Sequence, residues 1–198
     1  MKIIGSTLLI ACLSVSAFGA AGHEHVCSSG WEVHAGLGIS ELTEKEDGHQ
    51  TEGTTLHLHA TKGSDYTFYG YPVGFSIGAE TFLDADINHH CLHLGPTIFL
   101  TDSWKLSFGP SIEYALHDHG HHDDDHDDDV GEGHHDEEGE GHHDEEANDW
   151  ETEIGWYIET CACIYHVDNF SIGLYACYGE TDHEEHTSIG INIGAFLR

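Results

Sequence analysis

Apolar side chains alternate with small or polar ones along eight segments that occupy most of the chain after residue 29. A period of two is that of a β-strand and not of a helix. A soluble sandwich would bury the apolar face, whereas a membrane barrel turns it toward lipid. The eight segments are 31–39, 56–60, 73–79, 90–100, 104–116, 150–164, 170–178 and 189–197.

Three features favour the membrane version. The face opposite the apolar one carries small and polar residues, as a narrow barrel interior requires, and aromatic residues lie near segment ends, as at a membrane interface. The connections also alternate in length: those at 62–65, 101–103 and 167–169 are short, and the others are longer or more charged. We therefore expect an all-β fold, an eight-stranded antiparallel up-and-down transmembrane β-barrel over residues 30–198. Pro72, Pro96 and Pro110 predict bulges or edge-like pairing.

The N-terminus reads as a secretory signal over residues 1–20, followed by a short N-terminal segment, 21–29. A cationic start precedes an uncharged apolar run over 3–15, which is too short to span a bilayer, and small residues follow it. The lipoprotein-like sequence Leu9-Ile10-Ala11-Cys12 offers a second, less favoured cleavage site. Either cut predicts export, and the barrel pattern predicts the outer membrane of a Gram-negative-type bacterium with the long loops extracellular.

The charge balance excludes one class of partner. The formal net charge is −32, with only five Lys and Arg residues. Nucleic acid binding needs a basic surface, which this chain lacks. The acidic residues gather in the longer connections, so we expect divalent cations as partners there, with outer-membrane lipid and lipopolysaccharide around the barrel.

The connection over residues 117–149 differs from the rest. It holds nine His, no Lys, no Arg and no aromatic residue, and it contains the octapeptide GEGHHDEE twice in tandem, at 131–138 and 139–146. Such a segment is expected to be disordered without a ligand. Imidazole suits zinc, copper and nickel, and carboxylates add charge. The expected ligands are His117, His119, His121, His122, His126, His134, His135, His142, His143, Asp123, Asp125, Asp136 and Asp144.

Other histidines are secondary candidates for metal binding. Cleavage after Ala20 would leave Ala21-Gly22-His23, an amine and third-position His that chelate copper or nickel. The secondary candidates are His23, His25, His89, His90, His183 and His186. Zn²⁺ is the expected ion, with Ni²⁺ or Cu²⁺ as alternatives, and no catalytic cofactor is expected.

Charged residues on the inward face carry a different interpretation. Glu113, Glu151, Glu153, Glu159 and Lys105 should point into the barrel. A catalytic or ion-conducting set is one hypothesis, and the polar network that fills an eight-stranded lumen is the favoured one.

The cysteines leave three alternatives open. After the signal, five remain, so they cannot all pair internally. A bridge between Cys161 and Cys177, a thiolate metal site with Cys163, or unpaired inward thiols that act as small packing groups all fit the spacing.

Several stretches resemble small bacterial outer-membrane barrel proteins with His-rich, acidic loops. They are LHLH at 56–59, GFSIGAETFLDADINHH at 74–90, LSFGPSIEY at 106–114 and FSIGLYACYGETDHEEHTSIGINIGAFL at 170–197. The resemblance implies fold and location, and the group has no established activity. The last segment is similar to the insertion signal of outer-membrane proteins, with Leu197 where an aromatic residue is usual.

These observations predict a surface binding protein that holds a divalent metal, zinc first, in its His- and acid-rich loop. The alternative is a structural or adhesive barrel whose acidic loops have no specific metal role. We do not expect an enzyme, because the sequence shows no Ser or Asp–His constellation at the loop bases.

Overall fold

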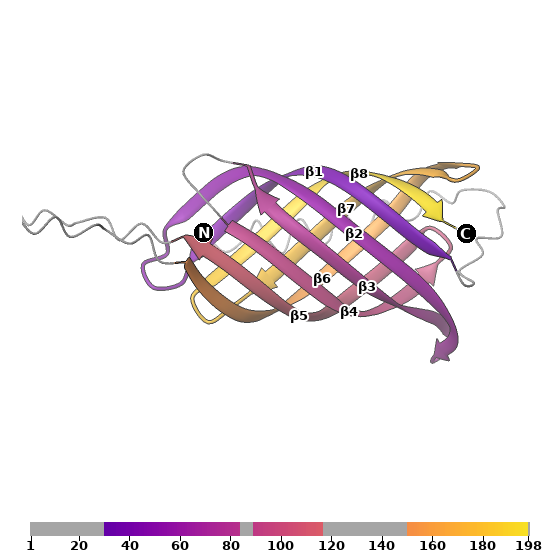
Figure 1. The fold of residues 1–198 in the computed structure, drawn as a ribbon, viewed down its shortest axis with the longest axis horizontal. Helices are drawn as coiled ribbons and strands as arrows, with labels where there is room; N and C mark the ends of the chain where they lie inside the picture. The colour runs from indigo at the N-terminus through magenta and orange to yellow at the C-terminus, as the bar shows by residue number, and fades with distance from the viewer. Residues whose placement is uncertain (1–29, 84–88, 117–149, 198) are drawn as a thin grey trace, which may run out of the picture.

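Eight antiparallel strands close into a single barrel in the computed structural model, which describes residues 30–83, 89–116 and 150–197 (Figure 1). The expected metal ligands at 117–149 and the signal at 1–20 lie outside those residues, as do His23 and His25. The strands are β1 (Trp31–Glu44), β2 (Gln50–Phe68), β3 (Tyr71–Phe82), β4 (His89–Thr101), β5 (Trp104–Leu116), β6 (Trp150–Val167), β7 (Phe170–Glu180) and β8 (Glu184–Leu197).

Each strand pairs with its neighbour in the sequence, and β1 pairs with β8 to close the ring. The closing ladder runs without a break from Trp31 opposite Leu197 to Glu44 opposite Glu184. The predicted all-β, eight-stranded up-and-down topology is confirmed. No helix among the described residues is long and apolar enough to cross a bilayer.

The apolar face of the strands points outward. Ile39, Ile154 and Ile191 are 69%, 77% and 59% exposed, although each lies within a strand. The alternate positions, such as Ser188 and Asn192 in β8, are buried inside the ring. Apolar side chains exposed around the outside of a polar interior are the arrangement of a transmembrane barrel, because lipid and not water then contacts them.

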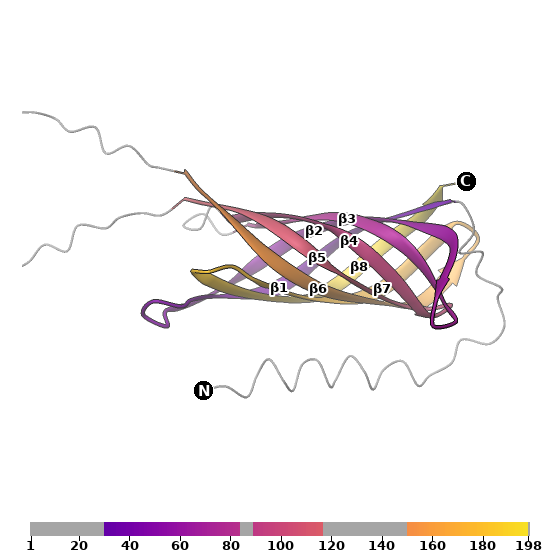
Figure 2. The same ribbon diagram turned by 90° about the horizontal axis from the view of Figure 1, so that it is seen from below.

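The connections sort by length between the two ends of the barrel, as predicted. The β2–β3 and β6–β7 turns lie at one end and the β1–β2 and β7–β8 connections at the other (Figures 1 and 2). The expected turn at 62–65 is wrong: β2 continues past it, with a register shift between Gly63 and Thr67, and the chain reverses at Tyr69 and Gly70. Both turn residues have positive φ, 49° and 87°, as a tight hairpin requires.

Strands also continue past the apolar segments at the long-loop end. In β8, Thr187 and Glu185 replace apolar residues on the outer face, while the inward positions His186 and Glu184 stay buried. A search for apolar alternation therefore ends these strands too early. His89 and His186, expected on external loops, are instead strand residues that point into the barrel.

Pro72 affects strand pairing differently from Pro96 and Pro110. Pro72 pairs with Thr67 beside the β2–β3 register shift, so a bulge is present there. Pro96 and Pro110 both fall where the β4–β5 ladder shows no pairs, between His93 opposite Ser111 and Thr97 opposite Ser107, and the register is kept across that gap. Proline has no N–H to donate, which accounts for an interrupted ladder without an extra residue.

Replacing Ile191 by Arg should destabilise the barrel in a bilayer by about 2–4 kcal/mol, because a charge would face acyl chains midway along β8. Thr187→Arg is the matched control on the same outer face near the long-loop end, where the cost should be about 0–1 kcal/mol. Denaturant unfolding in phospholipid vesicles, followed by heat-modifiable gel migration, measures both. Equal costs would contradict a lipid-facing exterior.

Candidate metal centre

The barrel interior is lined by polar, mostly ionisable side chains, which form three clusters. The mouth cluster, nearest the long-loop end, contains Glu80, His89, Glu113, Glu184 and His186. The central cluster contains His57, His59, His93, Glu159 and Cys161. The base cluster, nearest the short turns, contains Glu32, His34, Thr61 and Lys105. Nearly all of these side chains are buried.

Bulky rings fit in so narrow a lumen because glycines lie beside them in the sheet. His34, His59 and His93 occupy β1, β2 and β4 in one continuous hydrogen-bonded row, with Gly78 of β3 between the last two. A Cβ atom at Gly78 would overlap the His93 ring, and one at Gly194, paired with His34, would lie 2.5 Å from its Nδ1. The alternation of His and Gly across neighbouring strands is what lets three imidazoles occupy one hydrogen-bonded row of the sheet.

The mouth cluster is a network of His–Glu ion pairs. His89 Nε2 lies 3.1 Å from Glu113 Oε2 and 3.3 Å from Glu184 Oε2. His186 Nε2 lies 3.2 Å from Glu80 Oε2, and its Nδ1 lies 3.5 Å from Glu113 Oε1. Ser188 also donates to Glu80 Oε1 at 2.6 Å. Each imidazole here has a carboxylate at ion-pair distance, so the charges largely compensate one another.

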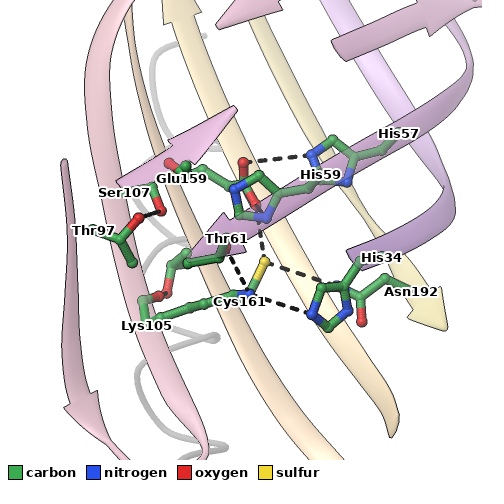
Figure 3. Close-up of polar contacts among 12 residues, drawn as sticks. His34, His57, His59, Thr61, Thr97, Lys105, Ser107, Glu159, Cys161 and Asn192 are labelled. Atoms are coloured by element: carbon green, nitrogen blue, oxygen red, sulfur yellow. Dashed lines mark hydrogen bonds and ion pairs between the residues drawn. The ribbon is translucent and has the colours of Figure 1, made fainter. Parts of the chain in front are cut away.

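The central cluster gathers three imidazoles around one carboxylate. Figure 3 shows two of them, His57 and His59, beside Glu159. Glu159 Oε2 lies 3.4 Å from both His57 Nε2 and His93 Nε2, and its Oε1 lies 3.4 Å from His59 Nδ1. Cys161 donates to Oε1 at 2.9 Å. The side chains of Glu159 and its three histidines are at most 1% exposed, so they are shielded from bulk solvent.

The base cluster is organised by one buried lysine. Lys105 Nζ donates to Glu32 Oε2 at 2.9 Å and to Thr61 Oγ1 at 3.1 Å, and it lies 3.3 Å from His34 Nε2 (Figure 3). The other oxygen of Glu32 pairs with His34 at 2.8 Å. The expected inward direction of Lys105, Glu113 and Glu159 is confirmed. The side chain of Glu151 is outside the described part of the chain.

The cysteines within the described ranges are all free. Cys91, Cys161 and Cys177 are buried in the lumen, and Cys163 is half-buried and donates to the carbonyl of Tyr165. The bridge between Cys161 and Cys177 is therefore not formed. Two of the inward thiols lie among potential ligands, Cys161 with Glu159 and His59, and Cys177 with Glu80 and His186.

The four secondary candidates that the structure describes, His89, His90, His183 and His186, lie in different environments. His89 and His186 belong to the mouth cluster. His183 is 70% exposed at the rim, 3.8 Å from Glu153, and His90 is half-buried with its Nδ1 3.2 Å from Thr81 Oγ1. The structure thus brings together two of the six.

Sequence reasoning overlooked His57, His59 and His93 as ligands. The signal was present in the alternation of Leu and His at 56–59 and again at 92–94, which places each His inward once the Leu face is assigned to lipid. The missing element was the register, since only the pairing of β2 with β3 and of β3 with β4 sets these rings beside each other.

Solved structures of small outer-membrane proteins have a similar architecture. The attachment invasion locus protein Ail of Yersinia pestis matches with a TM-score of 0.50 at 10% sequence identity, over 86% of this chain and 99% of Ail. This chain has the fold of the small outer-membrane β-barrels. Neisserial surface protein A matches with a TM-score of 0.46 at 11% identity, over 83% of this chain and 96% of that one. No protein family and no curated protein matches the chain by sequence.

Lys105→Met should destabilise this small outer-membrane β-barrel by about 3–5 kcal/mol, because the Glu32 carboxylate, only 17% exposed, loses its cation and keeps only its contact with His34. Adding Glu32→Gln to the same chain should recover much of the loss, since no uncompensated charge then remains. Unfolding free energies of the two single variants, the double variant and the parent complete the cycle. A double variant as unstable as the sum of the singles would show that the pair is not coupled.

Proposed function

We propose that this chain is an outer-membrane β-barrel that binds divalent transition-metal ions, zinc first, at the cell surface through its His- and acid-rich segment 117–149. The observation that carries the proposal is the concentration of nine histidines among carboxylates in one connection. A repulsive acidic surface would need only Asp and Glu, whereas imidazole adds the nitrogen donors that zinc, copper and nickel prefer.

The anchoring of this segment supports a site outside the membrane. Its two ends are attached to the paired residues Leu116 and Trp150, at the end of the barrel where the longer connections gather. The same rim carries His183, Glu153 and Glu180. A field of negative charge there raises the local concentration of cations, and histidines supply the selectivity for borderline metals over calcium or magnesium.

The proposed ligands are adjacent His pairs, each followed by an Asp, that recur along the segment. His121-His122, His134-His135 and His142-His143 each precede an Asp. Donors of this kind suit zinc, copper and nickel alike, so several related metals should compete for the same ligands. Such a surface suits concentrating or buffering a metal better than discriminating strictly between metals.

Zinc titration of the full-length protein by calorimetry should give several binding events at pH 7.5 and at least about tenfold weaker binding at pH 5.5. Imidazole binds metal only when neutral, and one pH unit below a pKa of about 6.5 roughly nine-tenths of it is protonated. The control is a loop-His variant in which the nine histidines between His117 and His143 are replaced by Asn, which keeps every carboxylate.

The proposal requires the loop-His variant to lose most of the zinc sites seen at pH 7.5. Equal zinc binding by parent and variant would overturn it. That outcome would favour the alternative, a structural or adhesive barrel whose carboxylates attract cations without a specific metal role.

A further inference from the structure

The central cluster has more unpaired polar atoms than a filled barrel interior normally tolerates. Both ring nitrogens of His57, His59 and His93 lack a hydrogen-bond partner, and so does Glu159 Oε2. The side chains are at most 1% exposed. A buried polar group without a partner destabilises the fold, so this concentration of donors and acceptors without hydrogen bonds favours an occupant.

The distances within the cluster identify that occupant. Direct His–carboxylate hydrogen bonds are about 2.7–3.2 Å long, but His57 Nε2 and His93 Nε2 both lie 3.4 Å from the same oxygen, Glu159 Oε2. Zinc bonds of about 2.0–2.1 Å at tetrahedral angles separate neighbouring ligand atoms by about 3.3–3.4 Å. Both distances to Glu159 Oε2 match that spacing, and one ligand atom from each of the three residues lies within 4.8 Å of the others. We infer that His57, His93 and Glu159 form a zinc-class metal site in the centre of the barrel.

Aromatic stacking fixes both imidazoles in that position. His57 stacks on Tyr175 with ring centroids 4.3 Å apart and an interplanar angle of 15°, and His93 stacks on Tyr157 at 4.4 Å and 22°. Both tyrosines are fully buried, and the hydroxyl of Tyr157 lies 3.2 Å from Ser76 Oγ. Rings held this way lose little freedom when they bind an ion, which distinguishes this site from the segment 117–149.

The carboxylate is held from its other side. Glu159 Oε1 accepts a hydrogen bond from the Cys161 thiol at 2.9 Å and lies 3.4 Å from His59 Nδ1. The Cys161 sulfur in turn accepts a hydrogen bond from Asn192 Nδ2 at 3.8 Å (Figure 3). These groups leave Oε2 directed at His57 and His93. In protein metal sites, the ligand side chains are regularly oriented by hydrogen bonds to atoms that do not contact the metal.

The mouth cluster provides the internal comparison. Its histidines lie 3.1–3.5 Å from their glutamates, and the shortest contacts, His89 to Glu113 at 3.1 Å and His186 to Glu80 at 3.2 Å, are within hydrogen-bond range. There the carboxylates compensate the imidazoles, whereas in the central cluster three imidazoles face a single carboxylate. Each mouth histidine thus has one ring nitrogen within hydrogen-bond range of a carboxylate, whereas both ring nitrogens of all three central histidines lack a hydrogen-bond partner.

The test uses the full-length loop-His variant, so that the metal it holds cannot be held by those nine histidines. The protein is refolded into detergent with Co²⁺ or Zn²⁺, passed through chelator, and analysed for metal per chain and for the visible ligand-field absorption of bound cobalt. We expect about one ion per folded chain, with the spectrum of a low-coordinate site. Folding is checked by heat-modifiable gel migration.

His93→Asn in this background should lower the retained metal about tenfold or more, and His34→Asn is the matched control, because His34 is an equally buried lumen imidazole outside the site. Glu159→Gln gives a second reading should His93→Asn not fold. A folded loop-His variant that retains no metal would overturn the inference and identify the cluster as a hydrated polar network. Equal retention by the His93 and His34 variants would overturn it too. Neither result bears on the zinc bound by the segment 117–149, which is measured as the difference between parent and loop-His variant.

Discussion

Closure of eight strands into a ring is the constraint on which everything else in this protein depends. Because side chains alternate across each strand, closure assigns every second residue to a lumen barely wide enough for side chains and leaves the rest to the outside. Ile39, Ile154 and Ile191 therefore face lipid, and polar residues fill the interior. The usual relation between burial and polarity is reversed, so a buried His or Glu in this chain is a consequence of the fold rather than an exception to it.

The lumen has to be filled without clashes, and glycine meets that requirement. Gly78 lies between His59 and His93 in the sheet, and its missing side chain provides the room that the His93 ring occupies. The packing of the interior and the position of its ligands are thus one property: a larger residue at Gly78 would move His93 before it affected the pairing of the strands. Placing ligands on strands rather than on loops gives a geometry that sheet hydrogen bonds maintain.

The sequence predicted the architecture well and the candidate site poorly. Strand number, the outward direction of the apolar face and the sorting of connections follow from a local period of two, so they could be read residue by residue. His89 and His186 were misplaced because their strands continue where the outer face becomes polar. The central cluster depends on the register between β2, β3 and β4 and on the shape of the closed ring, and neither is encoded in any single segment. The fold could be inferred locally, but the meeting of His57, His93 and Glu159 could not.

The two proposed cation sites differ in what holds the ion. At the rim, the proposed ligands belong to the segment 117–149, where carboxylates outnumber imidazoles, so the attraction there is largely one of charge and is weakened by salt. In the centre, stacked rings and a carboxylate fixed by Cys161 are already in place, so an ion that arrives there is held tightly and released slowly. At the base, Lys105 already pairs with Glu32, and His34 contacts the other oxygen of the same carboxylate. The base cluster therefore offers an entering ion less free negative charge than the mouth cluster, whose three carboxylates face two imidazoles.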